Sequence, residues 1–239
     1  VEPIKQISLK IKRFKSLKNK YPLFHTDAVQ AIQYLDCNVK ELGVDLLSAS
    51  SHKFYGPKGV GALYIRRGTR VHSLLHGGHH ERNRRAGTEN VMGIIGIGTA
   101  AELAVKDMSA RVTHLQSLRD LLIKSIEEKI DHVHLHGHRE KRLPNNVNIS
   151  VDFVEGESML LNLDLEGICA STGSACSSGS LEASHVLLSM GLSHEHAHGS
   201  LRFTLGKWNT EEDIERVLET LPGIVARLRA MSPLLKSQK

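Results

Sequence analysis

The chain has 239 residues, a net charge of +5 and a sequence pI of about 9.1; 40% of its residues are hydrophobic and 24% are charged. This balance is typical of a globular protein of one large domain or two small ones and excludes extensive disorder. No run of about 18 apolar residues occurs, so no membrane-spanning helix is expected, and the scattered basic residues carry no groove-reading motif, so no nucleic-acid partner is expected.

An amphipathic helix and three strands are predicted in the first 65 residues. The helix is indicated by apolar residues at three- and four-residue steps, namely Ile4, Ile7, Ile11 and Phe14. The lysines lie mostly off this stripe, which favours a solvated basic face over an anion-binding patch. Short apolar runs bounded by turn residues predict buried strands over 22–25, 44–48 and 61–65, with a crossover over 27–42.

Two long helices are predicted next, over 88–108 and 109–129. Thr88 can cap the first, because a threonine hydroxyl accepts a hydrogen bond from the first turn. We place the domain change at the junction of these helices, which gives domains 1–108 and 109–239.

The remaining pattern alternates between strands and helices. Strands are predicted over 146–151, 168–170 and 200–205, helices over 155–165 and 181–189, and a final helix that Thr210 opens. The mixture predicts an α/β fold of layered sheets covered by helices.

Two predicted strand ends carry residues that could take part in catalysis. Lys53 follows the predicted strand 44–48 and precedes a Gly/Pro turn, where its amine can join a carbonyl cofactor after losing a proton. Asp27 ends the strand before it, and could either pair with a protonated ring nitrogen or cap a helix. Without further observations, Lys53 is better explained as a solvated surface lysine, whereas the two interpretations of Asp27 are equally good.

Cys176 lies among small residues in the stretch 172–180. A thiolate is a nucleophile, and a loop with little to pack can carry it from place to place. Cys37 and Cys169 are the other cysteines, and this small odd number argues against a disulfide framework and for a cytoplasmic location. The chain begins with Val1 and shows no signal peptide, which we interpret as a fragment or a processed product.

Several stretches in one order resemble the cysteine desulfurases, which belong to the class V aminotransferases and adopt the aspartate-aminotransferase-like fold type I. The resembling stretches are HTDAVQA, SSHKFYGPKGVGALYIRRG, HGGHHERNRRAGTEN, NNVNISV, EGES, STGSACSSGSLEASHVL and AHGSLRFTLGKW. The cysteine loop is similar to that of the branch that serves nitrogenase and general iron–sulfur cluster assembly. The resemblance implies that 1–108 is the C-terminal part of the large cofactor domain, and that 109–239 is a small α/β domain with the catalytic cysteine loop.

The resemblance also implies the site residues. The cofactor would be pyridoxal 5'-phosphate, joined to Lys53. Asp27 would contact its ring nitrogen and Gln30 its phenolic oxygen. Its phosphate would be bound by Ser50, by His52 and by Thr88 from the neighbouring subunit of a homodimer. Arg202 would bind the substrate carboxylate, and Cys176 would accept the sulfur.

The implied reaction takes sulfur from L-cysteine, releases L-alanine and leaves a persulfide on Cys176 for an iron–sulfur scaffold or another acceptor protein. The family's glycine-threonine phosphate loop, its ring-stacking histidine and an asparagine that contacts the cofactor would lie before Val1, so we expect the chain alone to bind the cofactor poorly and to be inactive. His79 and Ser51 stand where the family more often has glycine.

Other functions stay open. Within the same class of enzyme, the chain could be a selenocysteine lyase or another aminotransferase-like lyase. Alternatives of a different class are a scaffold or regulatory protein with an inactive cofactor site, an inactive fragment and a metal-binding protein. The stretch 194–198 fits the H-E-x-x-H zinc pattern, but Gly199 leaves little room for a helix. His132, His134, His136 and His138 would share a face on a strand; a solvated edge is favoured over a weak metal-binding module, and no metal site is assigned.

Overall fold

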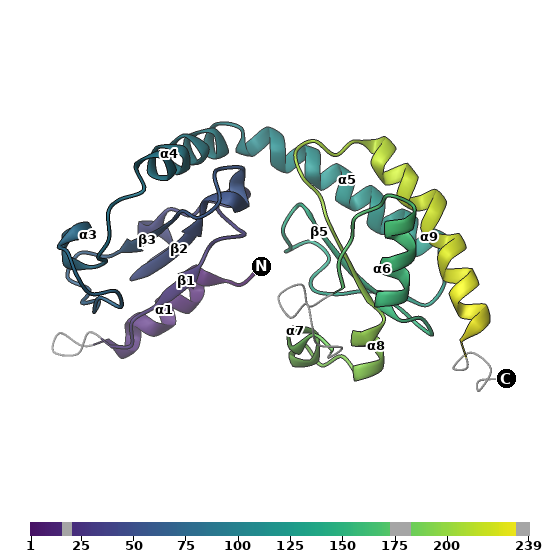
Figure 1. Ribbon diagram of the computed structural model, residues 1–239. Helices are drawn as coiled ribbons and strands as arrows, with labels where there is room; N and C mark the ends of the chain where they lie inside the picture. Colours follow the sequence, from purple (N-terminus) through teal and green to yellow (C-terminus); the bar gives the residue numbers. More distant parts are fainter. Residues whose placement is uncertain (16–20, 173–182, 233–239) are drawn as a thin grey trace. The chain divides into compact units, whose positions relative to one another are not determined.

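The computed structural model describes residues 1–15, 21–172 and 183–232 (Figure 1). The chain divides into two compact units, Glu2–Ala110 and Arg111–Lys239, the latter together with Val1. In the described part, each unit is built on a three-stranded sheet. None of the helices in these residues combines the length and the apolar character needed to cross a membrane.

The N-terminal unit surrounds the sheet β1-β2-β3, in which β1 and β2 are parallel and β2 and β3 are antiparallel. Its elements in chain order are α1 (Ile4–Phe14), β1 (His25–Asp27), α2 (Val39–Leu42), β2 (Leu46–Ser50), the 3-10 helix η1 (Ser51–Phe54), β3 (Gly61–Ile65), α3 (His80–Asn83) and α4 (Val91–Lys106). A parallel pair needs a crossover, and the predicted 27–42 segment provides it.

The predicted amphipathic helix is confirmed as α1. It packs closely on the end of α2, where the buried Ser8 hydroxyl donates to the Gly43 carbonyl at 2.9 Å. Gly43 has a φ of 71°, and a Cβ there would lie 2.3 Å from the Ser8 oxygen. Glycine is therefore required at this turn for both its backbone conformation and its size.

Asp45 is a buried carboxylate that joins three segments of the N-terminal unit. It forms an ion pair with Lys15, accepts from the Phe24 N–H at 2.9 Å and lies 3.4 Å from Nε of Arg66. Burial alone would raise the pKa of Asp45, but the hydrogen bonds from Lys15 and Phe24 and the charges of Lys15 and Arg66 outweigh it, so the pKa lies below its usual value.

Three boundaries in this unit were predicted imprecisely. The strands expected over 22–25 and 44–48 begin two or three residues later, because Phe24 and Val44 are apolar residues of the segments that lead into the strands. Asn90, and not Thr88, caps α4: its side-chain oxygen accepts from the Gly93 N–H at 3.1 Å. The prediction for β3 is confirmed.

The long helix α5 (Met108–Lys129) leads into the C-terminal unit, which is built on the antiparallel sheet β4-β5-β6. The other elements are β4 (Val133–Leu135), β5 (Asn146–Val151), α6 (Gly156–Leu165), α7 (His185–Ser189), α8 (His194–His198), β6 (Ser200–Thr204) and α9 (Glu211–Met231). Thr210 caps α9 as predicted, in a reciprocal capping box with Asp213.

An extensive core holds the C-terminal unit together. Helix α9 lies beside α6 (Figure 1), and the apolar side chains of both helices, of α5 and of the sheet are buried, including Leu115, Leu122, Val147, Ile149, Met159, Leu163, Leu201 and Leu221. The strand prediction for 168–170 is wrong: these residues form no strand, and only the next residue, Ser171, bridges to the sheet, through an isolated pair with Arg202.

Candidate functional site

The carboxyl ends of β1 and β2 meet at one edge of the N-terminal sheet. The strands are parallel and Asp27 is in register with Ser48, so the residues that follow each strand emerge on the same side. This edge is where open α/β sheets bind their ligands. Asp27, Ser50, His52 and Lys53 all lie on these two strand ends.

Lys53 lies on η1, a single tight turn directly after β2. Ser51 and Phe54 are buried beneath it, and Phe54 packs against Ala100 and Ala104 of α4. The side chain of Lys53 is exposed, and its amine forms no hydrogen bond or ion pair with any described residue. The buried residues of this turn therefore fix the backbone of Lys53, while its amine stays free to react.

A buried glutamine, which sequence reasoning missed, fixes the lysine backbone. Gln33 is 6% exposed and its side-chain N–H donates to the Lys53 carbonyl at 2.6 Å. It belongs to the turns between β1 and α2, so it joins the segment that follows Asp27 to the segment that carries Lys53. The sequence pattern does not predict the burial of Gln33, because a polar residue in a crossover segment is ordinarily exposed to solvent.

The polar groups around this edge are partly engaged. Ser50 Oγ lies 3.0 Å from Nδ1 of His52, and Asp27 Oδ1 accepts from the Val29 N–H at 2.9 Å. The second carboxylate oxygen of Asp27 has no partner among the described residues. Asp27 thus caps the following turn with one oxygen and keeps the other available, so both predicted roles are compatible with one geometry.

Gln30 and Thr88 are exposed, and neither side chain is engaged by the residues that the structure describes. Their predicted contacts with a cofactor therefore stay predictions. The edge offers a free amine, a carboxylate, and a hydroxyl–imidazole pair. These groups fit the aldehyde, the ring nitrogen and the phosphate of pyridoxal phosphate.

Arg202 lies on β6 in the C-terminal unit and is tied to its neighbours on both sides. It is in register with Asn148 of β5, and its backbone exchanges two hydrogen bonds with Ser171, at 2.6 and 3.0 Å. Its side-chain Nε is buried and has no hydrogen-bond partner among the described residues. A buried guanidinium nitrogen without a partner is costly unless an anion binds it, which suits a substrate carboxylate.

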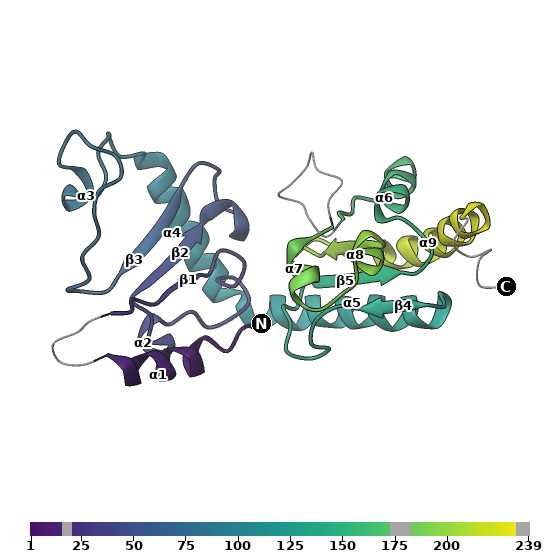
Figure 2. The ribbon, with the colours of Figure 1, turned by 90° about the horizontal axis from the view of Figure 1, so that it is seen from below.

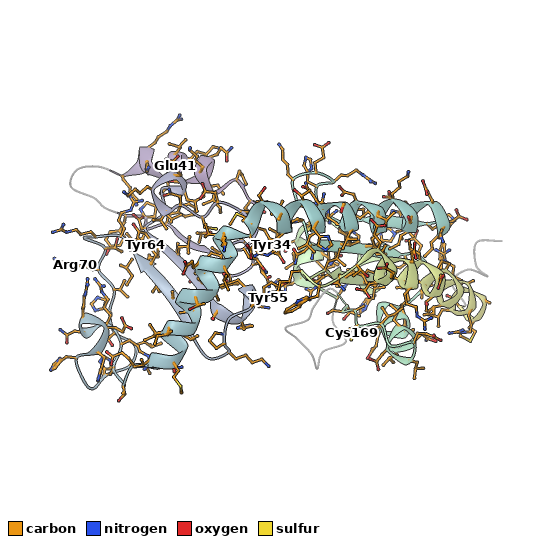
Figure 3. The ribbon with its side chains drawn as sticks, turned by 90° about the horizontal axis from the view of Figure 1, so that it is seen from above. Tyr34, Glu41, Tyr55, Tyr64, Arg70 and Cys169 are labelled. Atoms are coloured by element: carbon orange, nitrogen blue, oxygen red, sulfur yellow. The ribbon has the colours of Figure 1, made fainter. Side chains whose placement is uncertain are left out.

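The Arg202–Ser171 bridge lies five residues before Cys176, which is outside the described residues. Of the other cysteines, Cys169 is exposed (Figure 3) and Cys37 is half-buried. Burial, and then the charge of Asp36, raise the pKa of the Cys37 thiol, so Cys37 is a poor nucleophile near neutral pH.

Comparison with known proteins gives a consistent family. The model of the class-V aminotransferase family matches residues 3–217. The chain is 55% identical over 234 residues to a protein of Dictyoglomus turgidum named cysteine desulfurase IscS, and 54% identical over 234 residues to one of the same name from Methanosarcina thermophila. These matches cover 98% of the chain in both cases, but only 58% and 56% of the two relatives.

Solved structures agree with the sequence matches. A NifS-like protein superposes with a TM-score of 0.84 at 36% identity, covering 95% of this chain and 57% of that one. A NifS-like protein from Rickettsia africae gives the same TM-score at 31% identity, covering 93% and 57%. The chain therefore spans somewhat more than half the length of the proteins it matches.

Proposed function

Since the chain belongs to the class-V aminotransferase family, we propose that it forms part of a pyridoxal-phosphate-dependent cysteine desulfurase. The enzyme takes sulfur from L-cysteine, releases L-alanine and holds the sulfur as a persulfide on Cys176. Two relatives that are more than half identical to this chain bear that name.

The observation that carries the proposal is the bridge between Arg202 and Ser171. The bridge fixes the start of the cysteine segment beside a guanidinium whose buried Nε has no hydrogen-bond partner among the described residues. Five residues of chain reach at most about 18 Å, so the tether keeps the thiol of Cys176 in the neighbourhood of a substrate that is held by its carboxylate.

The N-terminal unit supplies the cofactor residues in this proposal. Lys53 holds pyridoxal phosphate and later moves protons as a general acid and base. Asp27, through its free oxygen, keeps the ring nitrogen protonated, while Ser50 and His52 hold the phosphate. When bound, the cofactor withdraws electrons from the substrate carbons.

The sulfur transfer itself is a nucleophilic displacement. Arg202 orients the substrate by its carboxylate. The Cys176 thiolate attacks the substrate sulfur, a sulfur–sulfur bond forms and the bond from that sulfur to the β-carbon breaks. The carbon skeleton takes up a proton and leaves as L-alanine, and the persulfide sulfur passes to an acceptor protein such as an iron–sulfur scaffold.

Several finer points are proposals of the same kind. We expect a homodimer in which Thr88 reaches the phosphate of the second subunit, a cytoplasmic location, and weak cofactor binding with no activity by the chain alone. The last expectation is supported by the relatives, of which the chain matches only 58% or less.

Cofactor attachment can be tested on the chain as it stands. Borohydride reduction after incubation with pyridoxal phosphate makes any attachment permanent, and peptide mass spectrometry locates it. We expect label concentrated on Lys53, with the neighbouring exposed Lys58 as the matched control. Label spread evenly over the exposed lysines would contradict the assignment.

The reaction needs a second experiment. The chain is fused to the N-terminal segment of the Dictyoglomus turgidum relative, and alanine release from L-cysteine is compared with release from L-selenocysteine. We expect a persulfide on Cys176 and none on the exposed Cys169. A folded fusion that binds the cofactor and releases alanine only from selenocysteine would make the protein a selenocysteine lyase.

A further inference from the structure

Two histidine-containing stretches that are far apart in sequence converge on one carboxylate in the C-terminal unit. His134 lies in β4, His196 lies in α8, and Asp152 directly follows β5. Helix α8 lies over β5 (Figure 2). Sequence reasoning treated these stretches as two unrelated metal patterns and assigned a site to neither.

Strand geometry explains why these side chains meet. His134 is paired with Ser150 on β5, and Asp152, two residues further along, faces the same side of the sheet. The Ser150 hydroxyl is buried and donates to the backbone carbonyl of His196, which holds α8 against this face. The Ser193 hydroxyl caps α8 by accepting from the His196 N–H at 3.2 Å.

Each oxygen of the Asp152 carboxylate faces one imidazole. Oδ2 lies 2.9 Å from Nε2 of His134, within hydrogen-bond distance. Oδ1 lies 3.3 Å from Nε2 of His196, yet this buried oxygen forms no hydrogen bond in the described structure. The two rings are 5.0 Å apart between centroids. A hydrogen-bonded His–Asp–His chain would satisfy both oxygens, and this arrangement does not.

We propose that His134, Asp152 and His196 form a binding site for a divalent transition-metal ion of the zinc class. Their three donor atoms lie within 4.8 Å of one another. Donors bound to one tetrahedral zinc ion lie about 3.3 Å apart, so small rotations of the two half-exposed imidazoles complete the geometry. Imidazole nitrogen and carboxylate oxygen suit zinc, and three protein ligands leave a fourth position for water.

The Arg229 side chain does not engage the Asp152 carboxylate. The Arg229 guanidinium donates to the backbone carbonyls of Asp152, at 3.1 Å, and Asp131, at 2.7 Å, rather than to the Asp152 side chain. A metal ion would therefore not displace an existing side-chain ion pair of Arg229.

The neighbouring histidines are otherwise engaged. The His132 ring packs edge-on against Phe153, and His138 Nδ1 accepts from the backbone N–H groups of Glu140 and Lys141, each at 3.1 Å. The H-E-x-x-H pattern does form a helix, α8, but that helix has five residues, and only His196, which is not one of the residues of the pattern, enters the cluster.

A bound ion would join α8 to the β4-β5 face. Helix α8 leads through Gly199 directly into β6, which carries Arg202. A bound ion would therefore stabilise the segment that leads into β6, the strand that is proposed to bind the substrate. The site contains none of the residues proposed for cofactor binding or sulfur transfer. Its existence does not depend on the desulfurase assignment.

Zinc chloride titration of the whole chain against a chromophoric chelator tests the site. We expect one tight equivalent, weakened at least tenfold by Asp152→Asn, His134→Gln or His196→Gln. The matched controls His132→Gln and His138→Gln should bind zinc as the unmodified chain does. Equal affinity in the ligand variants and the controls would overturn the proposal.

Two measurements on the unmodified chain test the site without relying on variants that could be unfolded, and show whether cysteines bind the metal instead. Diethylpyrocarbonate should modify His134 and His196 less when zinc is present, while His132 is modified equally with and without zinc. Cobalt(II) in place of zinc should show d–d bands without a thiolate charge-transfer band. Unchanged modification of His134 and His196, or a thiolate band, would assign the bound metal to other groups.

Discussion

The two units of the molecule bury their apolar side chains to very different extents. In the described part of the N-terminal unit the buried apolar residues are few and include two small clusters, one of Ala28, Val44 and Leu47 and the other of Phe54, Ala100 and Ala104. On α4 of that unit several large apolar side chains are exposed, among them Val91, Met92, Ile95 and Val105. In the C-terminal unit many aliphatic side chains of α5, α6, α9 and the sheet are buried, among them Leu115, Leu163, Leu201 and Leu221.

This difference separates the proposed cofactor residues from the larger apolar core. The N-terminal unit presents Lys53 and Asp27 on exposed strand ends, which are held in place by a few buried residues. A helix as apolar as α4 is ordinarily packed against other parts of a protein. The C-terminal unit has the core expected of a self-sufficient domain. Changes at the exposed edge should therefore alter chemistry with little effect on folding, and changes in the C-terminal core should do the opposite.

The largest effect should come from Lys53 and Cys176, the two residues that are proposed to react. In the fusion protein, Lys53→Ala and Cys176→Ser should each lower alanine release at least about 10³-fold, because each removes a group that reacts directly. Only Lys53→Ala should also abolish cofactor attachment, measured by absorption and borohydride labelling. Retention of both attachment and activity in Lys53→Ala would remove Lys53 from the mechanism.

The next effect tests the core of the C-terminal unit. Leu163 on α6 is fully buried, and Leu163→Ala should lower the free energy of unfolding by about 3 kcal/mol through lost burial and a cavity. Hydrogen exchange followed by mass spectrometry should show faster exchange in β5 and β6 and unchanged exchange in β1 and β2. Faster exchange in both sheets would show that the units do not fold independently.

Arg202 should give an intermediate effect. Loss of a charged hydrogen-bonding group to the substrate costs about 2 kcal/mol, so Arg202→Ala should lower kcat/KM for L-cysteine about 30-fold, mainly through KM. Arg202→Lys should restore part of it, since it keeps the charge but not the planar fork. The exposed neighbour Thr204 provides the control: Thr204→Ala should leave kcat/KM unchanged.

The smallest effect concerns pH and the N-terminal unit. Asp45→Asn should lower its stability by about 1–2 kcal/mol at pH 7 by removing the charge that Lys15 and Arg66 face. Because the pKa of Asp45 is lowered in the folded state, its contribution is complete above the unfolded pKa of about 3.9 and is lost as the pH falls towards the folded value. The free energies of unfolding of the unmodified chain and of Asp45→Asn, measured with urea, should therefore converge as the pH falls below about 4. A constant difference down to pH 2 would contradict this role.

Much of the fold could be predicted from periodicity and turn chemistry. The strand β5 and the final helix with its Thr210 cap follow directly from local patterns. The errors occur where tertiary contacts decide. Thr88 and Asn90 are both competent caps, and the first turn of α4 selects Asn90. Residues 168–170 have strand character, but only Ser171 pairs with the sheet.

The positions of the candidate site residues in the fold were more predictable than their contacts. Lys53 and Asp27 lie at the edge that strand-end reasoning indicated, whereas Gln33, which braces the lysine, carries no local signal. The cluster of His134, Asp152 and His196 could not be found from spacing, because it depends on the register of β4 with β5 and on the docking of α8.

The bridge between Ser171 and Arg202 has a consequence for how such enzymes can diversify. The bridge is made by backbone atoms ahead of Cys176, so residues inserted or deleted between the bridge and the cysteine would change the length of the tether without shifting Arg202. If the proposed sulfur transfer is correct, delivery to a new recipient could evolve by changes of length alone, while recognition of the amino acid is kept.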